Sequence, residues 1–127
     1  MSKYWKIMLL VIAAGWMISC EQNPPSRGSE PCLVLINELD GEATLLIDYN
    51  GKNVGLTAEA GQSNSMKMEV VSRRLGVYGG FYPDITVKVW NPVKVTYEII
   101  SQEVSSMNVR HDFRVQVCSD KTVILNP

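Results

Sequence analysis

Alternating apolar and polar residues flank the dipeptide Asn50-Gly51 on both sides, from Ala43 to Ala58. Asn-Gly is the preferred centre of a two-residue type I′ turn, whose twist matches that of two antiparallel strands. Around such a turn, residues at equal distances from its centre face each other, and the apolar ones share one side. The facing pairs of that side are Tyr49 with Lys52, Ile47 with Val54, Leu45 with Leu56, and Ala43 with Ala58. The sequence therefore predicts a β-hairpin with one mostly apolar face.

Period-two alternation recurs after residue 31, whereas helical periodicity is nearly absent there. Ile85–Trp90 and Val93–Ile100 form a second alternating pair, which is either a hairpin or two strands of different sheets. A two-residue loop between them would put an apolar residue opposite Lys94 and mix the two faces. We therefore predict a loop of three or more residues, with the apolar sets on a common face.

The longest alternation covers Met107–Val117 and places the only histidine, His111, on its apolar side. Three further segments are predicted strands: Cys32–Asn37, Met66–Val71 and Thr122–Asn126. Seven or eight short strands with turn residues between them are typical of an all-β, antiparallel β-sandwich or of a small barrel. We expect an Ig-like sandwich, and a small closed β-barrel is the alternative.

The first 20 residues have the parts of an export signal. Lys3 and Lys6 make a basic start, and Ile7–Met17 is an apolar stretch too short to span a bilayer comfortably. Ser19 and Cys20 follow, and polar sequence begins directly after the cysteine. Two other interpretations are an ordinary secretory signal with an incidental cysteine and an uncleaved N-terminal anchor helix.

The run Met17-Ile18-Ser19-Cys20 resembles the lipobox of bacterial lipoproteins, although Met17 replaces the usual leucine. The resemblance implies that residues 1–19 are a lipoprotein signal peptide and that the Cys20 thiol receives a diacylglycerol. The new amino group is often acylated too, as with palmitate. Two or three acyl chains anchor a protein stably, since each buried CH₂ contributes about 0.8 kcal/mol.

Glu21 bears on where such a lipoprotein would reside. In enterobacterial-type sorting an aspartate after the lipidated cysteine retains the protein in the inner membrane, and glutamate usually does not. The resemblance thus implies a lipid-anchored protein of the cell envelope. An outer-membrane location is favoured if the source has two membranes, with the domain facing the periplasm or the surface.

Residues 21–31 contain no large apolar side chain, so residues 20–31 are predicted to be a flexible tether, and 32–127 a single small domain. Loss of residues 1–19 removes two of the 12 basic residues, which leaves ten against 13 acidic ones and a net charge of about −3. This balance indicates no nucleic-acid partner. The expected partners are the membrane, through the N-terminal lipid, and an unknown envelope protein or glycan.

If Cys20 carries lipid, Cys32 and Cys118 remain. An even pair of cysteines in an exported chain predicts a disulfide, which would reinforce a domain with a small core. A metal pair or a redox pair has no support, because the sequence contains no CxxC and a single histidine. No metal or cofactor is predicted.

Catalytic motifs are absent from the sequence. It contains no Gly-x-Ser-x-Gly, phosphate-binding glycine loop, HExxH or calcium loop. His111 is expected to be a partly buried core residue, and a Ser–His–Asp arrangement with Ser72 or Ser119 is the alternative. Asp40 and Glu42 fall in a predicted turn and are expected to be solvated charges. The sequence therefore predicts a protein that is not an enzyme.

Arg73 to Asp84 is the least ordinary segment, because it combines adjacent arginines, glycines and aromatics. Tyrosine and arginine are favoured at recognition surfaces, where they provide large rigid contacts and bidentate hydrogen bonds. The alternative is a glycine-kinked crossover whose aromatics fill the core. The candidate binding residues are Arg73, Arg74, Tyr78, Phe81 and Tyr82.

Part of this segment, Val71-Ser72 with Gly76-Val77-Tyr78-Gly79-Gly80, resembles the Ser-Gly-x-x-Tyr loop of membrane-bound inhibitors of C-type lysozyme. Those proteins are short lipoproteins with a β-barrel and a cysteine pair joining its ends. The spacing from Gly to Tyr differs here, and the Trp-x-Lys-Gly element of that family is absent.

We therefore expect a membrane-anchored, non-enzymatic binding or structural module. The resemblance implies an envelope enzyme inhibitor as the alternative, beside a small hydrolase.

Overall fold

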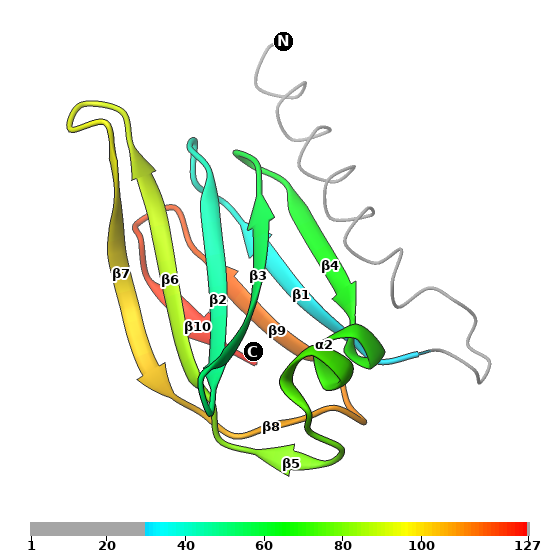
Figure 1. The fold of residues 1–127 in the computed structure, drawn as a ribbon. Coiled ribbons are helices and arrows are strands. Elements are labelled where there is room, and N and C mark those ends of the chain that lie inside the picture. Colours follow the sequence, from blue (N-terminus) through cyan, green and yellow to red (C-terminus); the bar gives the residue numbers. More distant parts are fainter. Residues whose placement is uncertain (1–29, 127) are drawn as a thin grey trace, which may run out of the picture.

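The computed structural model describes residues 30–126. The predicted signal peptide, Cys20 and most of the predicted tether lie outside these residues. Within them, ten strands and one helix follow in the order drawn in Figure 1. Their bounds are β1 Cys32–Asn37, β2 Ala43–Tyr49, β3 Lys52–Ala58, β4 Ser63–Lys67, α2 Met68–Leu75, β5 Gly80–Phe81, β6 Asp84–Asn91, β7 Thr96–Val104, β8 Met107–Asn108, β9 Phe113–Val117 and β10 Val123–Leu125.

Eight of these strands form two four-stranded sheets that pack face to face (Figure 1). One sheet has the order β10-β9-β1-β4 and the other β3-β2-β6-β7, while β5 and β8 pair at one end. Neighbouring strands are antiparallel, except that β1 and β9 run parallel. The predicted all-β sandwich is confirmed, and the sheets form no closed barrel. The strand count exceeds the prediction of seven or eight because the two-residue strand β5 was not predicted and because the predicted strand Met107–Val117 divides into β8 and β9.

The β2–β3 hairpin has the predicted register throughout, from Tyr49 opposite Lys52 to Ala43 opposite Ala58. Asn50 and Gly51 have φ values of 51° and 80°, the left-handed conformation that a type I′ turn requires at both central positions. Local turn chemistry and the apolar pattern thus select the same register.

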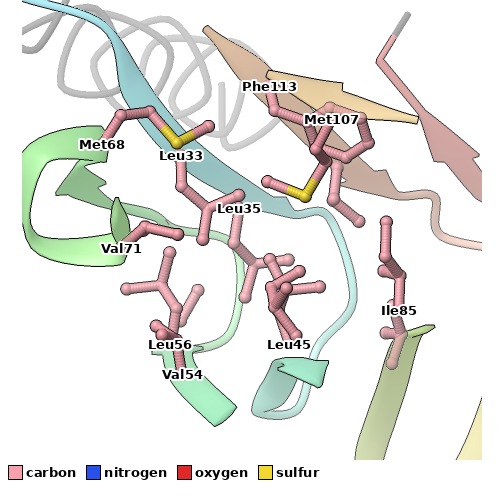
Figure 2. Packing of buried hydrophobic residues seen from close by; sticks show 14 of the residues in the cluster. Leu33, Leu35, Leu45, Val54, Leu56, Met68, Val71, Ile85, Met107 and Phe113 are labelled. Atoms are coloured by element: carbon pink, nitrogen blue, oxygen red, sulfur yellow. The ribbon is translucent and has the colours of Figure 1, made fainter. Parts of the chain in front are cut away.

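The hydrophobic core lies between the two sheets (Figure 2). Leu33 and Leu35 of β1 and Phe113 of β9 point toward Leu45 of β2 and Ile85 of β6. All five side chains are buried. Burial of each such side chain contributes about 1.5–3 kcal/mol, so this layer is the main source of stability.

Helix α2 closes one end of the core, where Met66–Val71 was predicted to be a strand. That prediction is wrong beyond Lys67, where β4 ends and the helix begins. Met68, Val71 and Leu75 are buried at helical spacing, and Gly76, with φ 69°, ends the helix through a hydrogen bond from its N–H to the Ser72 carbonyl. The short apolar run fits either structure by pattern alone.

The predicted hairpin of Ile85–Trp90 with Val93–Ile100 exists as β6 and β7, joined by a four-residue loop between the paired residues Asn91 and Thr96. This agrees with the predicted loop of three or more residues. The register shifts at a bulge between Val87 and Lys88. The apolar residues of β7 do not share the inward face of β6, however: Tyr97 lies opposite Trp90, and Ile99 opposite Lys88.

The alternation of Met107–Val117 does not form one strand. It divides into β8 and β9, separated by a turn in which the His111 N–H donates to the Asn108 carbonyl at 3.1 Å. The His111 side chain is exposed. The prediction of a partly buried His111 is therefore wrong, because the two-residue period of side-chain direction does not continue through a turn.

Asn37, at the end of β1, organises the loops at the end of the sandwich opposite α2. Its amide nitrogen donates to the carbonyls of Gly41 at 2.8 Å, Glu59 at 3.0 Å and Ala58 at 3.2 Å. Its amide oxygen accepts from the Leu39 N–H at 3.0 Å. One buried side chain thereby joins the β1–β2 loop to the end of β3.

Candidate binding surface

The structure separates the five residues predicted to bind a partner. Arg73 and Arg74 lie in the last turn of α2 with exposed side chains, and Tyr78 and Tyr82 are 80% and 69% exposed. Phe81 is only 4% exposed and packs edge to face against Tyr49, with ring centroids 5.1 Å apart. Phe81 is therefore a core residue, as the alternative interpretation expected, while the other four remain accessible.

The segment that resembles the lysozyme-inhibitor loop is partly helical. Ser72 lies within α2, and its hydroxyl donates to the Val77 carbonyl. The Ser72 hydroxyl therefore stabilises the C-terminal end of α2 by bonding to the residues that follow the helix. Within residues 30–126 the sheets also do not close into the barrel of that family.

The predicted Cys32–Cys118 disulfide is not formed, and Cys118 is a free thiol. In the parallel pairing of β1 with β9, Cys32 precedes the first pair, Leu33 with Phe113, and Cys118 follows the last. Five paired positions at about 3.3 Å each keep the two cysteines more than about 16 Å apart. A disulfide requires Cα atoms within about 7 Å. The prediction rested on an even number of cysteines, which contains no information about the parallel β1–β9 pairing that separates these two residues.

Exposed apolar side chains gather on the β6–β7 hairpin. Of the eight large apolar residues exposed in the described part of the chain, five belong to this hairpin: Val93, Val95, Tyr97, Ile99 and Val104. Val93, in the loop, is 89% exposed. Single exposed apolar residues are ordinary on protein surfaces, whereas a contiguous group indicates an interaction site. We define the hairpin patch as Trp90, Val93, Val95, Tyr97 and Ile99.

Two aromatic rings and a carboxylate hold the centre of the hairpin patch in place. Trp90 and Tyr97 pack edge to face, with ring centroids 5.1 Å apart. The Tyr97 hydroxyl donates a hydrogen bond to the Glu42 carboxylate. This hydrogen bond is the main cause that raises the Tyr97 pKa, with partial burial and the Glu42 charge adding to it. The ring orientations are thus fixed before any partner arrives.

A cavity of about 450 Å³ opens beside the hairpin patch. It lies between the β1–β2 loop, the start of the β6–β7 loop and Lys121 of the β9–β10 loop. Leu39 and Val89 contribute apolar walls, and Asp40 and Glu42 contribute carboxylates. Asp40 and Glu42, expected to be solvated charges, therefore border a recess at the end of the sandwich.

The hairpin patch lies far from the point where the chain enters the domain. Residue 30 and the start of β1 are beside α2, whereas the β6–β7 loop is at the opposite end of the sandwich (Figure 1). β1 runs the length of its sheet from Cys32 to Asn37 and ends among the loops that border the cavity. Residue 30, where the described chain begins, and the hairpin patch are thus at opposite ends of the domain.

Sequence reasoning missed the hairpin patch because it assigned the alternating apolar residues of β7 to the core. The adjacent pair Ile99-Ile100 was the available signal, since two consecutive apolar residues interrupt a two-residue period. Ile100 packs against the core, and Ile99 is exposed. An alternating pattern defines two faces, but it does not say which of them is buried.

The residues described by the structure contain no cluster of acidic, histidine or cysteine side chains able to hold a metal ion. The single helix in residues 30–126 is too short to cross a membrane. Comparisons of this chain with protein families, with characterised proteins and with solved structures give no match.

Proposed function

We propose that this chain is an exported lipoprotein, anchored through acyl chains on Cys20, whose β-sandwich binds another envelope protein without catalysing a reaction. The observation that carries the binding role is the hairpin patch. Tyr and Trp side chains supply large rigid contacts, and interfaces concentrate their binding energy in a few such residues. Here the Trp90 and Tyr97 rings are already oriented by each other and by Glu42.

The position of the hairpin patch supports presentation to a partner. A lipid on Cys20 would hold the domain by its α2 end, and the patch would then be at the end of the domain farthest from the attachment point. The predicted tether can extend to roughly 35–40 Å, at about 3.3–3.6 Å per residue. Such reach lets the far end of the domain meet a partner that is not itself at the lipid surface.

The anchor is tested by replacing Cys20 with alanine in the full chain. Cells are fed an alkyne fatty acid, and labelling of the wild-type and Cys20→Ala proteins is compared after membrane fractionation. We expect the variant to lose the label and to accumulate as unprocessed precursor. Labelled, normally processed Cys20→Ala protein would refute lipidation at this residue.

The binding role is tested with the full chain purified in detergent and two matched double variants. Tyr97→Ser/Ile99→Ser removes the centre of the hairpin patch, and Tyr78→Ser/Tyr82→Ser removes two large side chains elsewhere that are even more exposed. Proteins that co-purify after chemical crosslinking in cells are quantified by mass spectrometry. We expect the recovered amount of at least one envelope protein to fall by about tenfold or more with the first variant and to remain at the wild-type level with the second. If the two variants recover every partner in equal amounts, the hairpin patch is not the binding surface.

A further inference from the structure

β7 is the last strand of its sheet and, among the described residues, pairs only with β6. A strand in this position has a row of backbone N–H and C=O groups without partners, and another chain can pair with it. Proteins commonly protect such an edge with a very short strand, with proline, with a β-bulge or with inward-pointing charged residues. β7 has nine residues and no proline, and its protection is limited to the bulge in its pairing with β6 and to the charges of Glu98 and Glu103.

The pairing with β6 shows which side chains of β7 lie on each face, because directly opposite residues of an antiparallel pair share a face. Glu98 lies opposite Val89 and Glu103 opposite Ile85, both of which are buried in the core. The two glutamates therefore form an inner row. The outer row is mostly apolar and consists of Tyr97, Ile99, Gln102 and Val104.

A second copy of this chain is a poor occupant of the edge. Suppose that the β7 strands of two copies pair antiparallel about a two-fold axis. The four outer-row residues of one copy then all face outer-row residues of the other copy only if Tyr97 faces Val104 and Ile99 faces Gln102. That register places Glu98 opposite Glu103 twice, once in each half of the pair. Like charges directly opposite each other destabilise a sheet, so the edge disfavours pairing with itself.

We propose that the β7 edge accepts an extended segment of a partner protein as an additional antiparallel strand, with basic side chains facing Glu98 and Glu103. Apolar side chains of the segment cover Tyr97 and Ile99 on the outer face. Backbone hydrogen bonds supply affinity in this mode of recognition, and alternate side chains supply specificity. The inference rests on the proposed binding role of the β6–β7 hairpin and names the chemistry of the partner.

The bulge sets the spacing of the basic residues. The β6 residues opposite Glu98 and Glu103 are Val89 and Ile85, four positions apart. A strand that follows the same register on the other side of β7 also carries its two basic residues four positions apart. Lys94, whose amine lies 3.5 Å from the Glu98 carboxylate, is an exposed competitor that an incoming cation can displace.

The test uses the full chain in detergent and a fluorescent heptapeptide, Ac-Val-Lys-Thr-Thr-Val-Lys-Val-NH₂, with binding measured by fluorescence polarisation. The matched peptide has glutamate at both lysine positions. We expect the wild-type protein to prefer the lysine peptide by about tenfold or more. The Glu98→Lys/Glu103→Lys protein is expected to reverse this preference. The control protein Glu59→Lys/Glu69→Lys, which carries the same charge change on exposed residues away from β7, is expected to keep it.

Strand addition is separated from simple charge attraction by a third peptide, the lysine peptide with N-methyl groups on the alternate backbone nitrogens that face β7 in the proposed pairing. It keeps every side chain but cannot form a continuous ladder of hydrogen bonds, so we expect its binding to be lost. Equal binding of the methylated peptide, or an unchanged preference after the charge reversal, overturns the proposal. If the peptides fail while crosslinked partners still depend on Tyr97 and Ile99, the binding role stands and strand addition is rejected.

Discussion

The Tyr97 hydroxyl donates a hydrogen bond to the Glu42 carboxylate, and these two residues are 55 positions apart in the chain. Glu42 directly precedes β2, and Tyr97 is near the start of β7. β6 lies between them in the sheet, and the Trp90 N–H of that strand donates to the Glu42 carbonyl at 3.1 Å. The contact between Tyr97 and Glu42 therefore crosses β6 and connects the edge strand β7 to the β1–β2 loop, which borders the cavity.

Glu42→Gln is predicted to lower the Tyr97 pKa toward its ordinary value, because the carboxylate that holds the phenolic proton is gone. Spectrophotometric titration of phenolate formation checks this, with Tyr97→Phe identifying the contribution of this tyrosine. Because the Tyr97 pKa is higher in the folded than in the unfolded protein, the hydrogen bond to Glu42 contributes fully to the free energy of unfolding below the ordinary tyrosine pKa. It is lost as the pH rises through the raised pKa. A Tyr97 titration that is the same with and without Glu42 would contradict the contact.

Asn37→Ala is predicted to destabilise the protein by about 2–4 kcal/mol, since it leaves the Leu39 N–H and three carbonyls without this partner. Chemical denaturation measures the change in the free energy of unfolding. The matched control is Asn64→Ala, which removes an exposed amide that donates to the Thr57 carbonyl at 2.8 Å. The control is expected to cost less than about 1 kcal/mol. Similar costs for both variants would show that Asn37 does not organise the loops.

Phe81→Ala is predicted to cost about 3–5 kcal/mol of unfolding free energy, because its buried ring packs against Tyr49. Tyr78→Ala, three residues earlier and largely exposed, should stay within about 0.5 kcal/mol of the wild type. The two variants are compared by thermal and chemical denaturation under identical conditions. A large loss with Tyr78→Ala would mean that this tyrosine packs into the core.

Cys118 is predicted to react slowly with iodoacetamide at neutral pH, because only the thiolate is nucleophilic. Partial burial of the thiol raises the Cys118 pKa, and the negative charges of Glu38 and Asp120 raise it further. Glu38→Gln should therefore lower this pKa and accelerate alkylation. Peptide mass spectrometry without reductant follows the modification of Cys118 over time. Complete protection of Cys118 in the absence of reductant would indicate that the thiol is bonded to another cysteine.

The sequence alone determined the β2–β3 hairpin and the all-β class. Both depend on short-range chemistry: Asn50 and Gly51 tolerate the left-handed conformation of their turn, and residues at equal distances from the turn must then pair. The same reasoning fails at Lys67, where strand and helix are both compatible with the local apolar run and packing at the end of the core selects α2.

The tertiary structure decided the features on which a function depends. Whether Ile99 or Ile100 faces the core depends on a bulge in the pairing of β6 with β7, and the hairpin patch follows from it. The separation of Cys32 from Cys118 depends on β1 and β9 running parallel, although they are far apart in sequence. His111 is exposed because its segment turns before it can pair. The physical reason is common to all three: a two-residue period records only the local alternation of side chains, while long-range pairing decides where each strand ends, which strand lies beside it and which of its faces is buried.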